Sequence, residues 1–585
     1  MAVESVVDAI ATCLQRFTQN AAVGRMGLVA TFEADSEHFL ENCLPLLKNG
    51  FAERPGNQLL VAFLMAKDLL VKPLAEPGML TVEEAAEVLK VAKVADPAFD
   101  VTLLQKVTEM HSLTAYLRVL EVLMLGAPTS RLAAMLAQVM RDGDLYLKSK
   151  AALLLGRLHQ KAGWVERQLS HADVRVRANA VESLWGDRSA DAQKVFTQAL
   201  SGEHQRTVGN ALVGLYRAGD PRSIRQIISM AQDERTPFKV TALWAMGHLG
   251  DPRFLPWLTE AMGRMEATLR PSVFQTIRRI RQQRDLFSSY GSLNIHLAAA
   301  NQLPDGSRRV QFSVVEAKRP AVLTEDNLVA TSVGVYEDGE SELDYTLKAL
   351  SVPELLSIAI ALPFRSADDP VQQGIASAAP ACVPLKRPRD QWALLRYANS
   401  GPADGTKPLK APVGELTGNH DEATALFMET GTTAQTAASL DKAATRLIKL
   451  LAGAPGDKHL ILVADSAESL ANIDVAAQTQ SAEVANVRIH TITPELSASE
   501  AGAVLDFEKL ARATGGLARR LADPSHLTMP LQAVLSNALS QFEVTYRKDD
   551  SGGGFPELKM QVYSTYGFGE AITFLIEGAQ DGQAT

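Results

Sequence analysis

The sequence predicts a multidomain protein of the α plus α/β class: an N-terminal α-solenoid, a β-sandwich and a doubly wound parallel α/β domain. Three patterns predict it. A helical pattern repeats about every 31 residues within 144–280, apolar and polar residues alternate after residue 286, and short apolar segments alternate with helical ones after residue 351. The chain of 585 residues is long enough for several cores, because single domains usually stop growing near ~250 to 300 residues.

Residues 1–143 are predicted to form divergent helical repeats. Apolar residues recur there at helical spacing, and Thr81 followed three residues later by Glu84 forms a capping box, which marks the start of a helix. These helices do not follow the 31-residue period. We therefore expect them to close one end of a stacked core, as terminal repeats do.

Residues 144–285 are predicted to form regular helical repeats. Small residues recur at steps of 29, 31, 31 and 31, and larger apolar residues keep step four positions later. The first set is Ala151, Ala180, Ala211, Ala242 and Val273, and the second is Leu155, Leu184, Leu215 and Met246. The turn Gly219-Asp220-Pro221 also recurs 31 residues later, as Gly250-Asp251-Pro252. A fixed period of roughly 20 to 50 residues is the signature of stacked supersecondary units.

The rest of the chain is predicted to be β and α/β. Residues 286–350 should be β-sandwich strands, because apolar and polar residues alternate there and Asp338-Gly339 is typical of a hairpin turn. In 351–540, short apolar segments such as LLSIAIAL and HLILVAD alternate with helical patterns, which indicates a parallel sheet covered by helices on both faces. Residues 541–585 should form strands that return to the β-sandwich.

Each unit of the 144–285 array resembles a HEAT repeat. The resemblance rests on the segment Asp173-Val174-Arg175-Val176-Arg177-Ala178 and its equivalents. Lys148, Arg177 and Lys239 hold the basic position of that family's second helix, and Val208 departs from it. Arrays of this family typically act as scaffolds, so the resemblance implies a binding surface.

The aromatic residues of the array are expected to pack inside it. Trp185, Tyr216 and Trp244 lie at or beside positions that face the core, where large aromatic side chains bury most of their surface. A second cluster, the arginines of IRRIRQQR, is expected to close the last helix, where cations meet the negative end of the helix dipole.

Roughly residues 350–545 resemble a von Willebrand factor A domain, flanked by the β-strands that often accompany it in bacterial proteins. The matching pieces are LSIAIAL, the GTT before a long helix, KHLILVADS, VRIHTIT, and LARATGG leading to FEVTYR. Functional members of this family hold a divalent metal with an Asp-x-Ser-x-Ser segment after the first strand, a Thr from a second loop and an Asp from a third. Such oxygen ligands suit hard cations.

The metal site implied by that resemblance is degenerate in this chain. The first loop has Pro363 where the carboxylate belongs, with Arg365 and Ser366 behind it, whereas Thr433 matches the second loop and Asp465 matches the third. An arginine beside two remaining ligands disfavours Mg²⁺. We therefore predict no metal at these loops, and we predict that the Arg365 guanidinium pairs with Asp465 in its place.

Charge is segregated along the chain. The net charge is -5 for residues 1–143, +8 for 144–285 and -12 for 286–585. The basic array could bind an acidic protein partner, dock residues 286–585 of its own chain, or bind nucleic acid; arginines on exposed helices also need no partner. The candidate partner-binding residues are Arg175, Arg177, Arg278, Arg279 and Arg281.

The sequence nominates no enzyme and no cofactor. It holds no phosphate-cradling Gly-x-x-x-x-Gly-Lys loop and no Gly-x-Ser-x-Gly elbow. Three dispersed cysteines and no long apolar run favour a cytoplasmic protein. The expected function is a non-catalytic scaffold or adaptor that binds through the solenoid face and the loops of a metal-free A-type domain. The alternatives are a nucleic-acid-binding protein that uses residues 144–285 and a HEAT-like enzyme of the lyase type.

Overall fold

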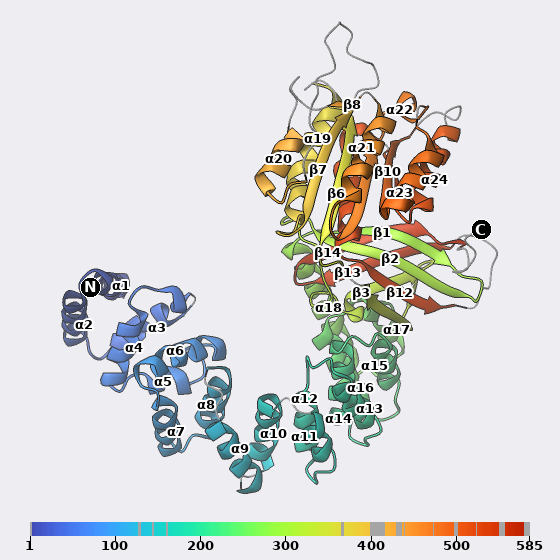
Figure 1. Cartoon of the computed structure of the whole chain (residues 1–585). Helices are drawn as coiled ribbons and strands as arrows, with labels where there is room; N and C mark the ends of the chain where they lie inside the picture. Colours follow the sequence, from blue (N-terminus) through green and yellow to red (C-terminus); the bar gives the residue numbers. More distant parts are fainter. Residues whose placement is uncertain are drawn as a thin grey trace. The chain divides into compact units, whose positions relative to one another are not determined.

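The structure is a computed structural model (Figure 1). It describes residues 3–48, 50–126, 130–142, 145–159, 162–350, 352–363, 368–397, 416–428, 436–437, 439–471, 473–495, 501–521, 523–548 and 556–577. The chain forms two compact units. The first comprises Met1–Ala218 with Met230–Ala245, and the second comprises Gly219–Ser229 with Met246–Thr585.

The N-terminal region is helical, as predicted. Its helices are α1 (Val3–Gln19), α2 (Ala21–Ala34), α3 (Phe39–Leu47), α4 (Asn57–Ala66), α5 (Val71–Ala75), α6 (Val82–Ala95), α7 (Phe99–Glu109), α8 (Leu113–Gly126) and α9 (Ser130–Asp142), with the 3-10 turn η1 (Phe51–Glu53). Apolar side chains from successive helices form one core that continues into α10.

The predicted capping box is present at the start of α6. The Thr81 hydroxyl accepts a hydrogen bond from the Glu84 amide at 3.1 Å, and the Glu84 carboxylate accepts one from the Thr81 amide at 2.8 Å. Thr81→Ala should remove one of these bonds and lower the free energy of unfolding by about 1 kcal/mol. Urea unfolding measures this loss, and Thr102→Ala, a change in the interior of α7, is the control. Equal losses of stability in the two variants would contradict the prediction.

The array consists of successive helices. They are α10 (Leu145–His159), α11 (Ala162–Gln168), α12 (Val174–Glu182), α13 (Ala190–Ala199), α14 (Gln205–Arg217), α15 (Arg222–Ala231), α16 (Thr236–Leu249), α17 (Leu255–Arg264) and α18 (Arg270–Tyr290), with η2 (Pro252–Phe254). Every residue of the two sets that recur along the period is at most 4% exposed, including Ala151, Ala211 and Met246. The predicted register of a helical repeat is therefore confirmed.

The turn that recurs every 31 residues has the same conformation both times. Gly219 and Gly250 adopt positive φ angles of 96° and 67°, which favour glycine because side chains with a Cβ are strained there. Asp220 then accepts a hydrogen bond from the Arg222 amide at 3.0 Å, and Asp251 accepts one from the Arg253 amide at 2.8 Å. Each turn thus ends one helix and starts the next.

Two sheets of the second unit share one apolar core. One has the strand order β15-β1-β2-β12-β5 and the other β14-β13-β3-β4. The strands are β1 (Leu293–Gln302), β2 (Ser307–Glu316), β3 (Val333–Glu337), β4 (Glu340–Glu342), β5 (Tyr345–Ala349), β12 (Phe542–Arg547), β13 (Glu557–Ser564), β14 (Gly567–Phe574) and β15 (Ile576–Glu577), with η3 (Ala330–Ser332). Because β12 pairs with β2 and β5, and β13 pairs with β3, the last strands do return to the first ones.

In the sequence, the strands of a third, parallel sheet lie between β5 and β12. Its order is β11-β10-β9-β6-β7-β8, and each neighbouring pair is parallel. Its strands are β6 (Leu356–Pro363), β7 (Gln391–Tyr397), β8 (Thr436–Ala437), β9 (Asp457–Val463), β10 (Val487–Pro494) and β11 (Ala518–Leu521). The order reverses between β6 and β9. In open α/β sheets, ligands bind beyond the carboxyl ends of the strands at such a switch point.

Helices cover both faces of the parallel sheet (Figure 1). One face packs against α19 (Pro370–Cys382), α20 (His420–Met428) and α25 (Thr528–Leu539), and the other against α21 (Leu440–Ala452), α23 (Val475–Ala485) and α24 (Ala501–Ala513). The remaining short elements are α22 (Ala467–Ala471), η4 (Val383–Leu385) and η5 (Pro524–His526). A helical region, antiparallel sheets and a parallel sheet were all predicted and are all present.

Candidate interaction site

Two tryptophans and an arginine cluster on successive repeats of the first unit: Trp185 follows α12, Arg217 ends α14 and Trp244 lies on α16. The rings of Trp185 and Trp244 stack with centroids 6.3 Å apart and an angle of 28° between their planes. The Arg217 guanidinium lies 4.7 Å from the centre of the Trp185 ring. Trp185 Nε1 donates to the Asn210 carbonyl at 2.8 Å, which fixes the indole. We call these three residues the tryptophan–arginine cluster.

This cluster corrects the expectation that the array's tryptophans only pack inside it. Trp185 is half-buried, but the Trp244 side chain is 40% exposed. A large aromatic ring that is held by stacking and still presented to solvent is suited to binding, because little side-chain entropy remains to be lost. The sequence could not distinguish a tryptophan that packs in the core from one that is exposed for binding, since both tryptophans lie beside buried positions of the period.

Charged side chains surround the cluster. Glu182 lies 4.0 Å from Arg157 and within hydrogen-bond reach of Asn210. Burial raises the pKa of Glu182 above its ordinary value, although the positive charges of Arg157, Lys150 and Arg217 oppose the rise. Three cations lie around this partly buried carboxylate, and one of them, Lys150, also pairs with Glu121. The remaining small excess of positive charge favours an acidic partner.

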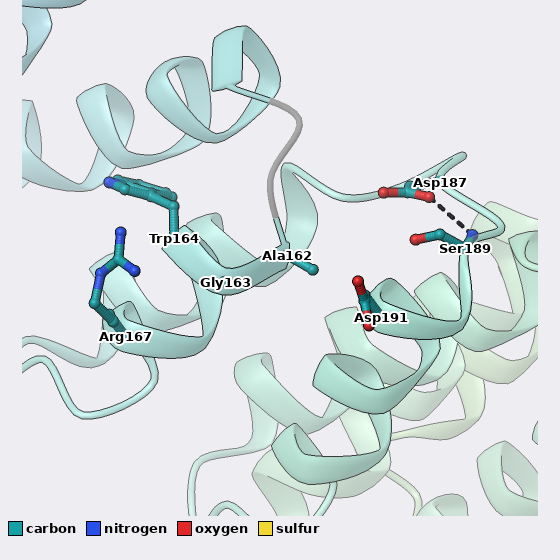
Figure 2. A pocket seen from close by; sticks show the side chains of 7 residues that line it. All are labelled: Ala162, Gly163, Trp164, Arg167, Asp187, Ser189 and Asp191. Carbon is teal, nitrogen blue, oxygen red and sulfur yellow. Dashed lines mark hydrogen bonds between the residues drawn. The ribbon is translucent and has the colours of Figure 1, made fainter.

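A pocket of about 400 Å³ lies between α11 and the segment that leads into α13. Figure 2 shows Trp164 and Arg167 on α11 and the side chains of Asp187, Ser189 and Asp191 opposite them. Asp187 accepts a hydrogen bond from the Ser189 amide at 2.9 Å, and Ser189 caps α13 through the Ala192 amide. The side chains of Asp187 and Ser189 therefore stabilise the turn that leads into α13.

The candidate arginines fall into two groups. Arg175 is exposed on α12, and Arg177 is half-buried and donates to the carbonyls of His171 and Ala172. Arg278, Arg279 and Arg281 are exposed on α18. The expectation that the latter close the last helix is wrong, because α18 continues to Tyr290. The negative end of the helix dipole lies more than two turns beyond them.

At the carboxyl edge of the parallel sheet, the structure places a buried arginine that sequence reasoning missed. Arg396, near the end of β7, donates from one terminal nitrogen to the Pro363 carbonyl at 3.3 Å and from the other to the Phe427 carbonyl at 3.2 Å. Beside it, the Tyr397 hydroxyl donates to the Val463 carbonyl at 2.8 Å. These bonds tie the ends of β6, β7, β9 and α20 together.

The predicted metal-site residues are only partly within the described structure. Pro363 is the last residue of β6 and is buried, and Asp465 follows β9. Asp465 accepts hydrogen bonds from Ser466 at 3.3 Å and Ser469 at 2.5 Å. Arg365, Ser366 and Thr433 lie outside the described residues, so the pairing of Arg365 with Asp465 stays a prediction. Within the described ranges, no group of three His, Cys, Asp or Glu side chains could hold a metal ion.

A buried ion pair joins the end of the array to the sandwich within the second unit. Arg253 and Asp251 lie 2.7 Å apart, and their side chains are 1% and 2% exposed. Arg253 also donates to the carbonyls of Thr331 at 2.6 Å and Val333 at 3.1 Å. The last repeat therefore contacts residues beyond 286 through hydrogen bonds from the charged Arg253 guanidinium. Docking of residues 286–585 against the array as a whole stays a prediction.

Two histidines form a buried pair in the parallel sheet. Nδ1 of His459 on β9 lies 2.9 Å from Nε2 of His490 on β10. The Leu517 amide donates to Nδ1 of His490 at 3.0 Å, so the proton of neutral His490 lies on Nε2 and is donated to His459. The proton of His459 then lies on its Nε2, which has no hydrogen-bond partner in the described structure.

Burial disfavours the charged form of these rings and of a third histidine. It lowers the pKa of His459 to about 4, with a further lowering by Arg488, and holds the pKa of His490 well below its ordinary value. Nε2 of His296 on β1 donates to Oε1 of Gln532 at 3.2 Å, and burial lowers the pKa of His296 to about 4. All three are therefore neutral at pH 7.

Comparisons with known proteins leave the family open. No family model matches the chain, and no curated protein matches it. A solved structure of human deoxyhypusine hydroxylase in complex with glycerol aligns with 48% of this chain and 98% of that chain, at 14% identity and a TM-score of 0.21. None of the helices in the described ranges is long and apolar enough to cross a membrane. At so low a TM-score the likeness assigns neither fold nor function.

Proposed function

We propose that this chain is a non-catalytic scaffold or adaptor that binds an acidic protein partner. Its helical repeats are of the HEAT type, and its parallel sheet belongs to an A-type domain that works without a metal ion. The tryptophan–arginine cluster carries the proposal, because exposed, pre-positioned tryptophan and arginine side chains are the residue types that dominate protein–protein binding energy. The loops at the switch point of the parallel sheet offer a second surface.

The test of this proposal is capture of partners from the native host with chemical cross-linking and mass spectrometry. We expect the wild-type chain to retain a defined set of acidic proteins that Trp244→Ala and Arg217→Ala lose. Val94→Ala is the matched control, because Val94 is 71% exposed but lies on α6, outside the array. Extracts treated with nuclease should give the same set. Equal capture by all four proteins would contradict the role of the cluster.

We predict from the charges at the sheet edge that the A-type domain binds no metal ion. Arg396 places a buried guanidinium against the end of β6, at the edge where a divalent cation would have to bind. A second cation close to it would be repelled strongly in a region of low dielectric. Calorimetric titration of the full chain with Mg²⁺ or Mn²⁺ should therefore show no saturable heat, and saturable binding near one equivalent would contradict the prediction.

A further inference from the structure

A second pocket in the first unit lies at the start of α14. It has a volume of about 280 Å³ and is lined by residues of two successive repeats, among them Arg177, Gly202, His204 and Thr207. It shares no residue with the tryptophan–arginine cluster. The pocket is therefore a separate feature of the first unit.

Two polar groups of residues that line this pocket have no hydrogen-bond partner in the part of the chain that the structure describes. Thr207 is only 4% exposed, and its hydroxyl makes no hydrogen bond within the described structure. Nδ1 of His204, which precedes α14, is also buried without a partner there. A buried hydroxyl or imidazole without a hydrogen bond costs roughly 1 to 3 kcal/mol. A ligand that accepts from both would remove that cost.

The N-terminus of α14 is not capped by the side chain of its N-cap residue. His204 is the N-cap residue of α14, and its side chain caps no amide. In the preceding repeat the residue 31 positions earlier is Asp173, whose carboxylate accepts a hydrogen bond from the Arg175 amide at 2.7 Å. The first amides of a helix carry partial positive charge and need acceptors. At α14 the N-cap residue, His204, provides no such acceptor.

The charged groups that shift the pKa of His204 are both positive. Burial lowers the pKa of His204, and the cations of Arg177 and Arg206 lower it further. Two carboxylates also line the pocket, Glu166 and Glu203, but Glu166 lies 3.7 Å from Lys194. The end of the pocket at His204 and Thr207 therefore combines a helix N-terminus, two unused donors and a nearby guanidinium, which is the arrangement that binds phosphates and carboxylates.

We infer that the pocket at the start of α14 binds an oxyanion group, a phosphate or a carboxylate, which occupies the place that the Asp173 carboxylate fills in the preceding repeat. The Thr207 hydroxyl, one His204 nitrogen and the first amides of α14 donate to it, and Arg177 neutralises its charge. The remaining volume admits a ligand larger than the oxyanion itself.

The experiment is isothermal calorimetry of the full chain with sodium phosphate, sodium acetate and sodium chloride at equal ionic strength. We expect saturable binding of phosphate, of acetate or of both, and none of chloride. A response to phosphate alone would identify a phosphorylated ligand, and one to acetate alone would identify a carboxylate ligand. No saturable binding of either anion by the wild-type chain would overturn the inference.

Two variants and a control locate the site. Thr207→Val should weaken binding at least tenfold. His204→Asp should raise the midpoint of thermal unfolding without added anion, because it restores the cap, and should abolish anion binding because its carboxylate occupies the site. Thr197→Val is the control, because it removes a hydroxyl that donates to the Gln193 carbonyl within α13. It should bind the anion as the wild type does. Wild-type affinity in both Thr207→Val and His204→Asp would overturn the assignment.

Discussion

Arg253→Ala should lower the free energy of unfolding of the second unit by about 3 to 5 kcal/mol. The substitution leaves the Asp251 carboxylate buried without its guanidinium partner, and it removes the donors to the carbonyls of Thr331 and Val333. Removing one partner of a buried pair costs far more than the net value of the pair, because the remaining charge has lost its solvation. Urea unfolding followed by circular dichroism measures the loss.

The repeat provides a matched control for this prediction. Arg222 occupies the same position of the Asp-Pro-Arg turn 31 residues earlier and pairs with Asp220 at 2.9 Å, but its side chain is 64% exposed. Arg222→Ala should therefore cost about 1 kcal/mol or less, as exposed pairs do. If the two variants lost equal stability, the anchoring role of Arg253 would be wrong.

Acidification from pH 6.5 towards pH 4 should destabilise the second unit through its three buried histidines. An unfolded histidine titrates near pH 6.5, whereas burial lowers the folded pKa of His296 and His459 to about 4. Between these values the unfolded chain binds more protons than the folded one, so stability is complete above pH 6.5 and is lost as the pH falls. Each of these two residues should contribute about 3 kcal/mol to the loss by pH 4.

The measurement is the urea midpoint at several pH values between 7 and 4.5, compared among three proteins. His459→Gln keeps an acceptor for His490 but cannot be protonated, so its stability should depend less steeply on pH than that of the wild type. His526→Gln is the control, because that side chain is 80% exposed. An identical pH dependence in all three proteins would refute the assignment to buried histidines.

The parts of the fold that repeat or alternate could be predicted from the sequence. The buried positions Ala151, Ala180 and Ala211 follow from one period, and β6 and β9 follow from apolar segments of strand length. The helices α19 and α25 could not be predicted in this way, since each contains prolines or small residues that obscure the helical pattern. In α19, Pro370 stands in the first turn, where it needs no amide partner, and Pro380 lies near the end of the helix.

The candidate sites depended on tertiary structure that the sequence does not encode locally. Arg396 had one signal, a single charge within the apolar segment QWALLRY, but only the strand order shows that it reaches the carbonyl at the end of β6. His459 and His490 are 31 residues apart on different strands, and parallel pairing brings them together. Likewise, Trp244 stacks on Trp185 across the repeat that lies between theirs in the sequence, which only the packing of the array shows.

In the proposed function, the tryptophan–arginine cluster binds an acidic protein. Its most direct test is the dissociation constant of a purified captured partner, measured by calorimetry for the wild-type chain, Trp244→Ala and Val94→Ala. We predict that Trp244→Ala weakens binding at least about tenfold, equivalent to ~1.4 kcal/mol, and that Val94→Ala leaves it unchanged. An unchanged dissociation constant in Trp244→Ala would contradict the claim.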